Sequence, residues 1–142
     1  GVDVSLTLNG EWNLFGAWMM GNDSKNMFVS QGIADAQKAS WNGAFVELDY
    51  APALLPLLDM PDWFFAYRYD LIRNNRQGDS TFAKNYNNVD SHTFLVRYFI
   101  HHSTRTDLAL HAEYNTYRTT GVGTNGGDLM GQTMLVGFDF AY

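Results

Sequence analysis

The chain alternates large apolar residues with small or polar residues in one segment after another. This period of two is typical of β-strands, because successive side chains point to opposite faces of a sheet. The helical period of 3.6 residues appears in almost no segment. The alternation predicts seven strands in a single domain spanning 1–142, near residues 2–8, 12–20, 43–50, 63–73, 92–102, 108–118 and 130–142. The expected fold class is therefore all-β and antiparallel.

The connections between these segments alternate in length. Residues 9–11 and 103–107 are short turns, 51–62 is intermediate, and 21–40, 74–90 and 119–129 are longer; 74–90 is rich in Asn, Gly and Asp. Tight turns at one end and longer loops at the other are typical of a transmembrane β-barrel. The pattern thus favours an antiparallel transmembrane β-barrel over a soluble sandwich.

Composition narrows the classes of partner. Acidic residues outnumber basic residues 15 to 9, which argues against nucleic acid. The chain has no cysteine, so it has neither a disulfide framework nor a haem-attachment motif. No stretch approaches the roughly 18 continuous apolar residues of a membrane helix. Aromatic residues make up 15% of the chain although its mean hydropathy is −0.25, which suits an apolar face spread over alternate residues.

One face of each expected strand is apolar, and the other carries charges and amides. In a membrane barrel the apolar face points outward to lipid and the polar face inward. Trp and Tyr near strand ends suit an interfacial aromatic girdle; these are Trp12, Tyr50, Trp63, Tyr114 and Tyr142. The residues expected to face lipid are Trp12, Trp18, Trp63, Tyr67, Val96, Tyr98, Leu108, Leu110, Phe138 and Phe140.

The first two strands admit an alternative. From Val2 to Met20 the alternation keeps one phase, so this segment could be one long strand. The Asn9-Gly10 dipeptide is a turn signal and favours a hairpin. A three-residue loop would also preserve the phase, because Leu8 and Trp12 would then lie on the same face.

The carboxy-terminal segment MLVGFDFAY, residues 134–142, resembles the β-signal of Gram-negative outer-membrane barrels. That signal ends on an aromatic residue after apolar residues at alternate positions. Its counterparts in this chain are Met134, Val136, Phe138, Phe140 and Tyr142. The segment YAPALLPLLDMPDWFFAYRYD also resembles the proline-containing periplasmic link and following aromatic strand of porin-like barrels. The resemblance implies location in a bacterial outer membrane, contact with outer-membrane lipid and lipopolysaccharide, and recognition by the barrel-assembly machinery.

The number of expected strands indicates whether the chain could form a complete barrel. If Tyr142 lies at the periplasmic edge, seven strands place Gly1 on the outer side, whereas complete bacterial barrels have an even number of strands. We therefore expect the chain to be the carboxy-terminal portion of a larger barrel, with missing strands upstream. Family habit suggests about 16 strands in total.

The leading functional hypothesis is a porin-like channel for passive diffusion of small solutes or ions, with no enzymatic activity and no cofactor. Its expected pore-lining residues are Asp3, Asn13, Glu47, Asp49, Arg68, Asp70, Arg97, His111, Glu113 and Asp139. Acidic residues dominate this set, so a modest preference for cations is expected. The alternative is a structural barrel that sheathes a lumen-filling partner, such as a periplasmic multihaem cytochrome in an electron conduit.

Other chemistry is weakly indicated. His101 and His111 are expected to share a face, but their spacing matches no common metal site, and no metal is expected. Glu113 and Asp139 could form a carboxylate pair for acid–base catalysis, although charged wall residues are the simpler interpretation. The loop GVGTNGGD has the glycines of a phosphate-binding loop without the Lys-Ser/Thr ending. A five-residue turn at 103–107 would place Arg97 directly opposite Glu113.

Overall fold

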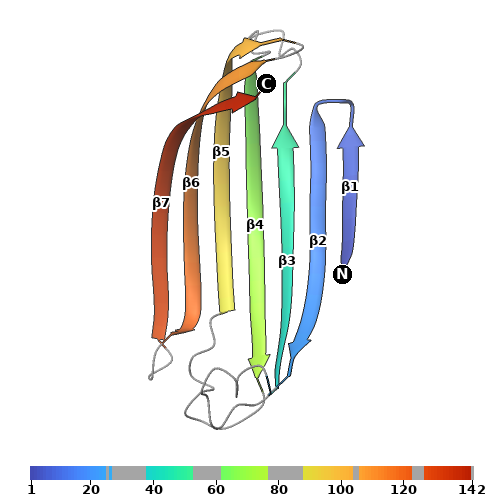
Figure 1. Ribbon diagram of the computed structural model, residues 1–142, viewed down its shortest axis with the longest axis vertical. Helices are drawn as coiled ribbons and strands as arrows, with labels where there is room; N and C mark the ends of the chain where they lie inside the picture. Colours follow the sequence, from blue (N-terminus) through green and yellow to red (C-terminus); the bar gives the residue numbers. More distant parts are fainter. Residues whose placement is uncertain are drawn as a thin grey trace.

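The computed structural model describes residues 1–24, 26, 38–52, 62–76, 88–103, 106–122 and 127–141. They form one seven-stranded antiparallel sheet in which each strand is hydrogen-bonded to its neighbours in the sequence (Figure 1). The strands are β1 (Val2–Leu8), β2 (Trp12–Asp23), β3 (Ala39–Tyr50), β4 (Trp63–Arg76), β5 (Asn88–His102), β6 (Asp107–Val122) and β7 (Gly127–Ala141). The all-β antiparallel class and the seven strands expected from the alternation are confirmed.

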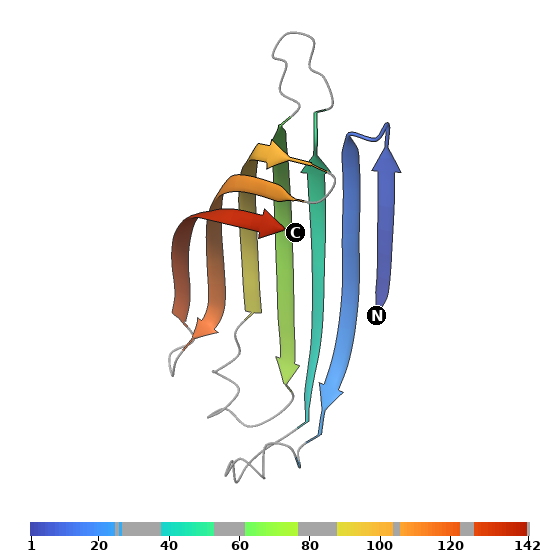
Figure 2. The ribbon, with the colours of Figure 1, turned by 45° about the horizontal axis from the view of Figure 1, so that its top comes forward.

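The sheet is open. β1 and β7 are its two edges, and no pairing joins them. Two views show that β5, β6 and β7 bend at the end of the short turns, where the carboxyl end of β7 is directed toward β4 (Figures 1 and 2). The sheet is therefore curled, although it does not close on itself. Among the described residues, no helix has the length and apolar character needed to cross a membrane.

A tight hairpin joins β1 to β2. Asn9 has φ 53° and Gly10 has φ 71°, and the Glu11 amide donates a hydrogen bond to the Leu8 carbonyl over 3.2 Å. Positive φ at both central positions is the geometry of a type I′ turn, which asparagine and glycine adopt most readily. Leu8 then pairs with Trp12 across the turn. The hairpin interpretation is confirmed, and a single long strand from Val2 to Met20 is excluded.

The register of β5 against β6 differs from the expectation. Arg97 pairs with His111, and Glu113 pairs with Leu95, so Arg97 and Glu113 are two residues out of the expected register. The turn accounts for one of these two residues: His102 pairs with Asp107, which leaves four residues between the strands, and the Ser103 amide donates to the Thr106 carbonyl over 3.0 Å.

A β-bulge next to this turn shifts the register further. Phe99 pairs with Ala109, and His101 pairs with Leu108, so Ile100 is an extra residue on β5. The extra residue interrupts the alternation of side chains, so the residues beyond the bulge lie on the opposite face from the one that the alternation predicts. His101 therefore shares a face with Leu108, and the expectation that His101 and His111 share a face is wrong.

The ladders define two faces. The ten residues expected to line a pore all lie on one face, called here the polar face; the ten expected to face lipid all lie on the other, called the apolar face. Among the described residues, no second layer covers either face, and the buried apolar side chains are those of Ala109 and Pro52. The part of the chain that the structure describes thus has no hydrophobic core of the kind with which a single soluble domain covers its apolar surface.

Candidate lumen-lining face

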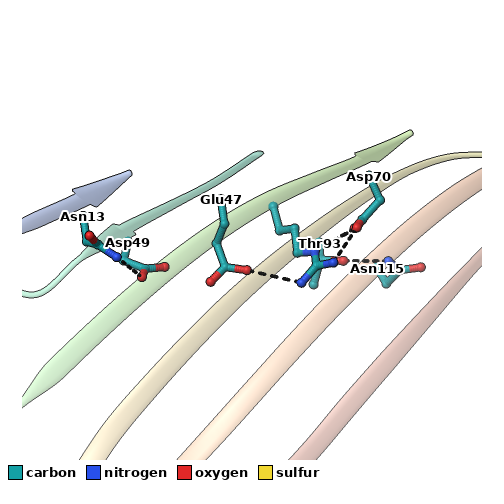
Figure 3. Close-up of polar contacts among 7 residues, drawn as sticks. Asn13, Glu47, Asp49, Asp70, Thr93 and Asn115 are labelled. Atoms are coloured by element: carbon teal, nitrogen blue, oxygen red, sulfur yellow. Dashed lines mark hydrogen bonds and ion pairs between the residues drawn. The ribbon is translucent and has the colours of Figure 1, made fainter. Parts of the chain in front are cut away.

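Three groups of interacting polar side chains form a row across the polar face from β2 to β6 (Figure 3). At its β2 end, the Asn13 amide donates to Asp49 on β3 over 3.4 Å and its oxygen accepts from Thr7 on β1 over 3.1 Å. At its other end, the Asn115 amide on β6 donates to Thr93 over 2.7 Å and to Ser91 over 2.8 Å, both on β5. The row therefore ties together neighbouring strands on both sides of β4.

Arg68 on β4 is the centre of this row. Its Nη2 lies 2.7 Å from Oδ1 of Asp70, two residues along the same strand, and its Nη1 lies 3.6 Å from Oε2 of Glu47 on β3. Its guanidinium also lies 4.1 Å from the ring centroid of Phe45, within cation–π distance. The side chain is 41% exposed, so these contacts hold it at the surface of the polar face. Two carboxylates neutralise this arginine.

A second ionic cluster lies near the short turns. Arg97 Nε on β5 is 2.8 Å from Asp139 Oδ2 on β7, and His111 Nδ1 on β6 is 2.9 Å from Asp139 Oδ1. The expected Arg97–Glu113 pair is replaced by this arrangement, because the register places His111 beside Arg97. Asp139 contacts Arg97 and His111 rather than Glu113, so the structure does not bring the two carboxylates together as an acid–base pair.

A hollow of about 510 Å³ opens on the polar face between the two clusters. Its lining residues come from four neighbouring strands, β3 to β6; they are Glu47, Phe64, Ala66, Arg68, Asp70, Thr93, Leu95, Arg97 and Glu113. The hollow lies over Ala66, whose methyl group is the smallest side chain in this set. It combines charged walls with an apolar floor.

Glycines beneath aromatic rings were missed by the sequence reasoning. Gly131 pairs with Tyr117 and Gly21 pairs with Trp41, and in each pair the ring occupies the space that a Cβ on the glycine would need. A third glycine, Gly137, lies under the ring of His111. A Cβ at position 137 would lie only 3.2 Å from Cε1 of that ring. These rings lie along the wall of the polar face. The signal was a glycine in mid-strand, which often marks close approach of another group.

The apolar face is widely exposed. Met134, Phe138 and Phe140 on β7 are 74%, 70% and 65% exposed. With Val136 they are the described apolar residues at alternate positions of the segment that resembles the β-signal, and its last residue, Tyr142, lies outside the described residues. An apolar surface of this extent is unusual in a water-soluble monomer.

Aromatic residues gather on the apolar face at the end of the short turns. Trp12 stacks on Tyr50 with centroids 4.2 Å apart, and Trp63 lies 5.0 Å from Tyr98. Tyr114, which was expected at a strand end, instead lies in the middle of β6, where its hydroxyl donates to Gln132 over 2.6 Å. The aromatic cluster at this end is thus formed by β2 to β5, without Tyr114.

Charged residues on the described apolar face are confined to the long-loop end of β4 to β7. Arg73 Nη2 lies 2.7 Å from Asp90 Oδ1, which also accepts from the Tyr69 hydroxyl over 2.8 Å. Arg118 pairs with Asp128 on the next strand. Each charge therefore has a partner of opposite sign.

Searches of protein-family models, of curated proteins and of solved structures found no match to this chain. Within the described ranges, no group of three or more His, Asp or Glu residues has an arrangement that could hold a metal ion. The two faces of the sheet are therefore the features from which a function can be inferred.

Proposed function

We propose that the chain forms part of a β-barrel in a bacterial outer membrane and that this barrel is a channel for small solutes or ions. The observation that carries the proposal is the uncovered apolar face. Lipid is the cover that such a face requires when no second protein layer packs on it. The outer-membrane location rests on the resemblance of residues 134–142 to the β-signal.

The outline of the apolar surface supports lipid rather than a protein partner. One hydrogen-bonded row on this face is apolar from β1 to β4 and charged on β5 and β6; it contains Val2, Trp18, Ala44, Leu71, Asp90, Arg118 and Met130. At the opposite end, the apolar residues of β1 to β3 stop at Leu8, Trp12 and Tyr50. Those of β6 and β7 continue through Leu110 and Phe138 to Leu108 and Phe140.

The apolar band therefore shifts toward the short turns as it crosses the sheet. The shift is about four residues, or roughly 13 Å, over about four strand spacings, or roughly 19 Å. This slope corresponds to strands inclined by about 35° to the normal of the band, similar to the 35–45° tilt of strands from the axis of membrane barrels. A flat band of lipid around tilted strands would produce this diagonal.

Closure needs further strands. β1 and β7 run in the same direction because five strands, an odd number, separate them in an antiparallel meander. Joining these two edges by antiparallel pairing therefore requires an odd number of additional strands. We infer that they come from elsewhere in the same protein.

The polar face would line the lumen of this barrel. The ten residues named above as pore-lining include six carboxylates and two arginines. Arg68 and Arg97 are each paired with carboxylates from this same set. The remaining negative charge favours cations over anions in this arc of the wall.

Conductance in a planar lipid bilayer tests the proposal. The purified full-length protein should insert and produce steady ionic conductance, with a reversal potential in a KCl gradient that indicates preference for K⁺. Protein that inserts and folds but conducts only after a bound partner is removed would support the sheath function instead. Protein that stays soluble and monomeric without detergent would contradict the membrane barrel itself.

A further inference from the structure

The hollow over Ala66 has a shape set by side-chain size. Ala66 on β4 pairs directly with Leu95 on β5, and Leu95 pairs with Glu113 on β6. Phe64, Arg68 and Arg97 are larger and surround this short side chain, so the wall is recessed at Ala66. The floor of the recess is thus aliphatic, and a carboxylate lies at its β6 side.

The two arginines of the hollow have ionic partners. Arg68 contacts both Asp70 and Glu47, at 2.7 Å and 3.6 Å. Arg97 pairs at 2.8 Å with Asp139, which lies outside the hollow, and its guanidinium is 5.7 Å from the centroid of the Phe64 ring. Neither cation is therefore left to neutralise a further carboxylate.

Glu113 is the charge that remains. Its carboxylate forms no hydrogen bond or ion pair with any other residue in the described ranges, although it lines the hollow. Its direct neighbours across both ladders are Leu95 and Leu135, which cannot offset its charge. A carboxylate between aliphatic side chains on a sheltered wall attracts a cation more strongly than one in bulk water.

We propose that this hollow is a binding subsite for organic cations, with Glu113 as the counter-ion of a primary ammonium group and Ala66 and Leu95 as the floor under a short aliphatic body. The subsite rests on the proposed channel function and names the class of solute that the channel retards during passage. A charge-assisted contact supplies the affinity for the ammonium group, and the recess supplies selection for the aliphatic part.

Block of single-channel current by n-butylammonium tests this proposal on the full-length protein in a planar bilayer. Glu113→Gln should raise the half-blocking concentration about tenfold, the effect of losing one charge-assisted contact. Ala66→Leu should raise it similarly without any change of charge, because the leucine side chain fills the recess. Glu11→Gln, the same chemical change in the β1–β2 turn, should leave the half-blocking concentration within about twofold.

The outcomes separate the two proposals. A folded, membrane-inserted protein that never conducts contradicts the channel function. If the channel conducts, equal effects of Glu113→Gln and Glu11→Gln would overturn the subsite, because they would indicate a diffuse field in the lumen. Block by n-butanol at the same concentration as n-butylammonium would also overturn it, since Glu113 would then have no role.

Discussion

Arg97 on β5 is bound to Asp139 on β7, with β6 between them, and the distance from Nε to Oδ2 is 2.8 Å. The contact is diagonal, because Arg97 pairs along the ladder with His111 and His111 pairs with Gly137. The missing side chain at Gly137 leaves room for the His111 ring, and Asp139 reaches both groups. The ion pair therefore spans two ladders.

A double-mutant cycle between Arg97 and Asp139 should give a coupling free energy of about 0.5–1 kcal/mol, the range for partly exposed ion pairs. The matched cycle between Arg97 and Glu113 should give a value near zero, because the two side chains do not pair. Urea unfolding in lipid vesicles measures both cycles, with Asp139→Asn, Glu113→Gln and Arg97→Gln as the single changes. A larger coupling to Glu113 would contradict the observed register.

A positive charge on the apolar face should be costly. Val96→Arg places a guanidinium near the middle of the apolar band and should reduce the free energy of unfolding by about 2–4 kcal/mol in vesicles. Thr93→Arg introduces the same group on the polar face of the same strand, and its cost should be about 1 kcal/mol, from the lost Asn115 hydrogen bond. Equal costs for the two variants would show that the faces are assigned wrongly.

Gly131→Ala should displace the Tyr117 ring away from the polar face of the sheet. The added methyl group would overlap the Cζ and hydroxyl of Tyr117, so the ring must rotate away from the wall. We expect a lower single-channel conductance together with a stability loss of about 1–2 kcal/mol. The control is Gly43→Ala, also on the polar face, where the methyl group would meet the Leu71 carbonyl at an ordinary 3.7 Å.

A second change distinguishes overlap from a general effect of alanine at position 131. Adding Tyr117→Ala to Gly131→Ala removes the overlapping atoms, so conductance should return to at least that of the unaltered protein. Conductance that stays low in the double variant would mean that the ring is not responsible.

Deletion of residues 140–142 should reduce the amount of protein in the outer membrane severely, without changing the amount synthesised. Phe140 belongs to the exposed apolar row of β7, and the resemblance to the β-signal depends on the aromatic terminus. Leu135→Ala, on the polar face of the same strand, is the control and should assemble normally. Immunoblots of fractionated membranes measure both variants. Normal assembly of the truncated chain would contradict the assembly-signal hypothesis.

The sequence by itself determined the strands and their faces. Side chains alternate between faces with a period of two, so the pattern of each strand indicates which of its residues lie on the polar face and which on the apolar face, without reference to its neighbours. Asn9 and Gly10 were likewise sufficient to predict the β1–β2 hairpin, because few other residues adopt positive φ at both central positions of the turn. The expected strand from 2 to 8 agrees with β1 residue for residue.

The tertiary structure alone decided which residues meet across strands. The length of the turn after His102 and the extra residue at Ile100 set the β5–β6 register, and neither leaves a clear mark in the alternation. Pairing partners depend on the hydrogen-bonded register of two strands, and a bulge changes that register without altering the pattern of either strand. Hence Glu113 was placed on the correct face, but the partner of Arg97 and the recess over Ala66 emerged only from the folded sheet.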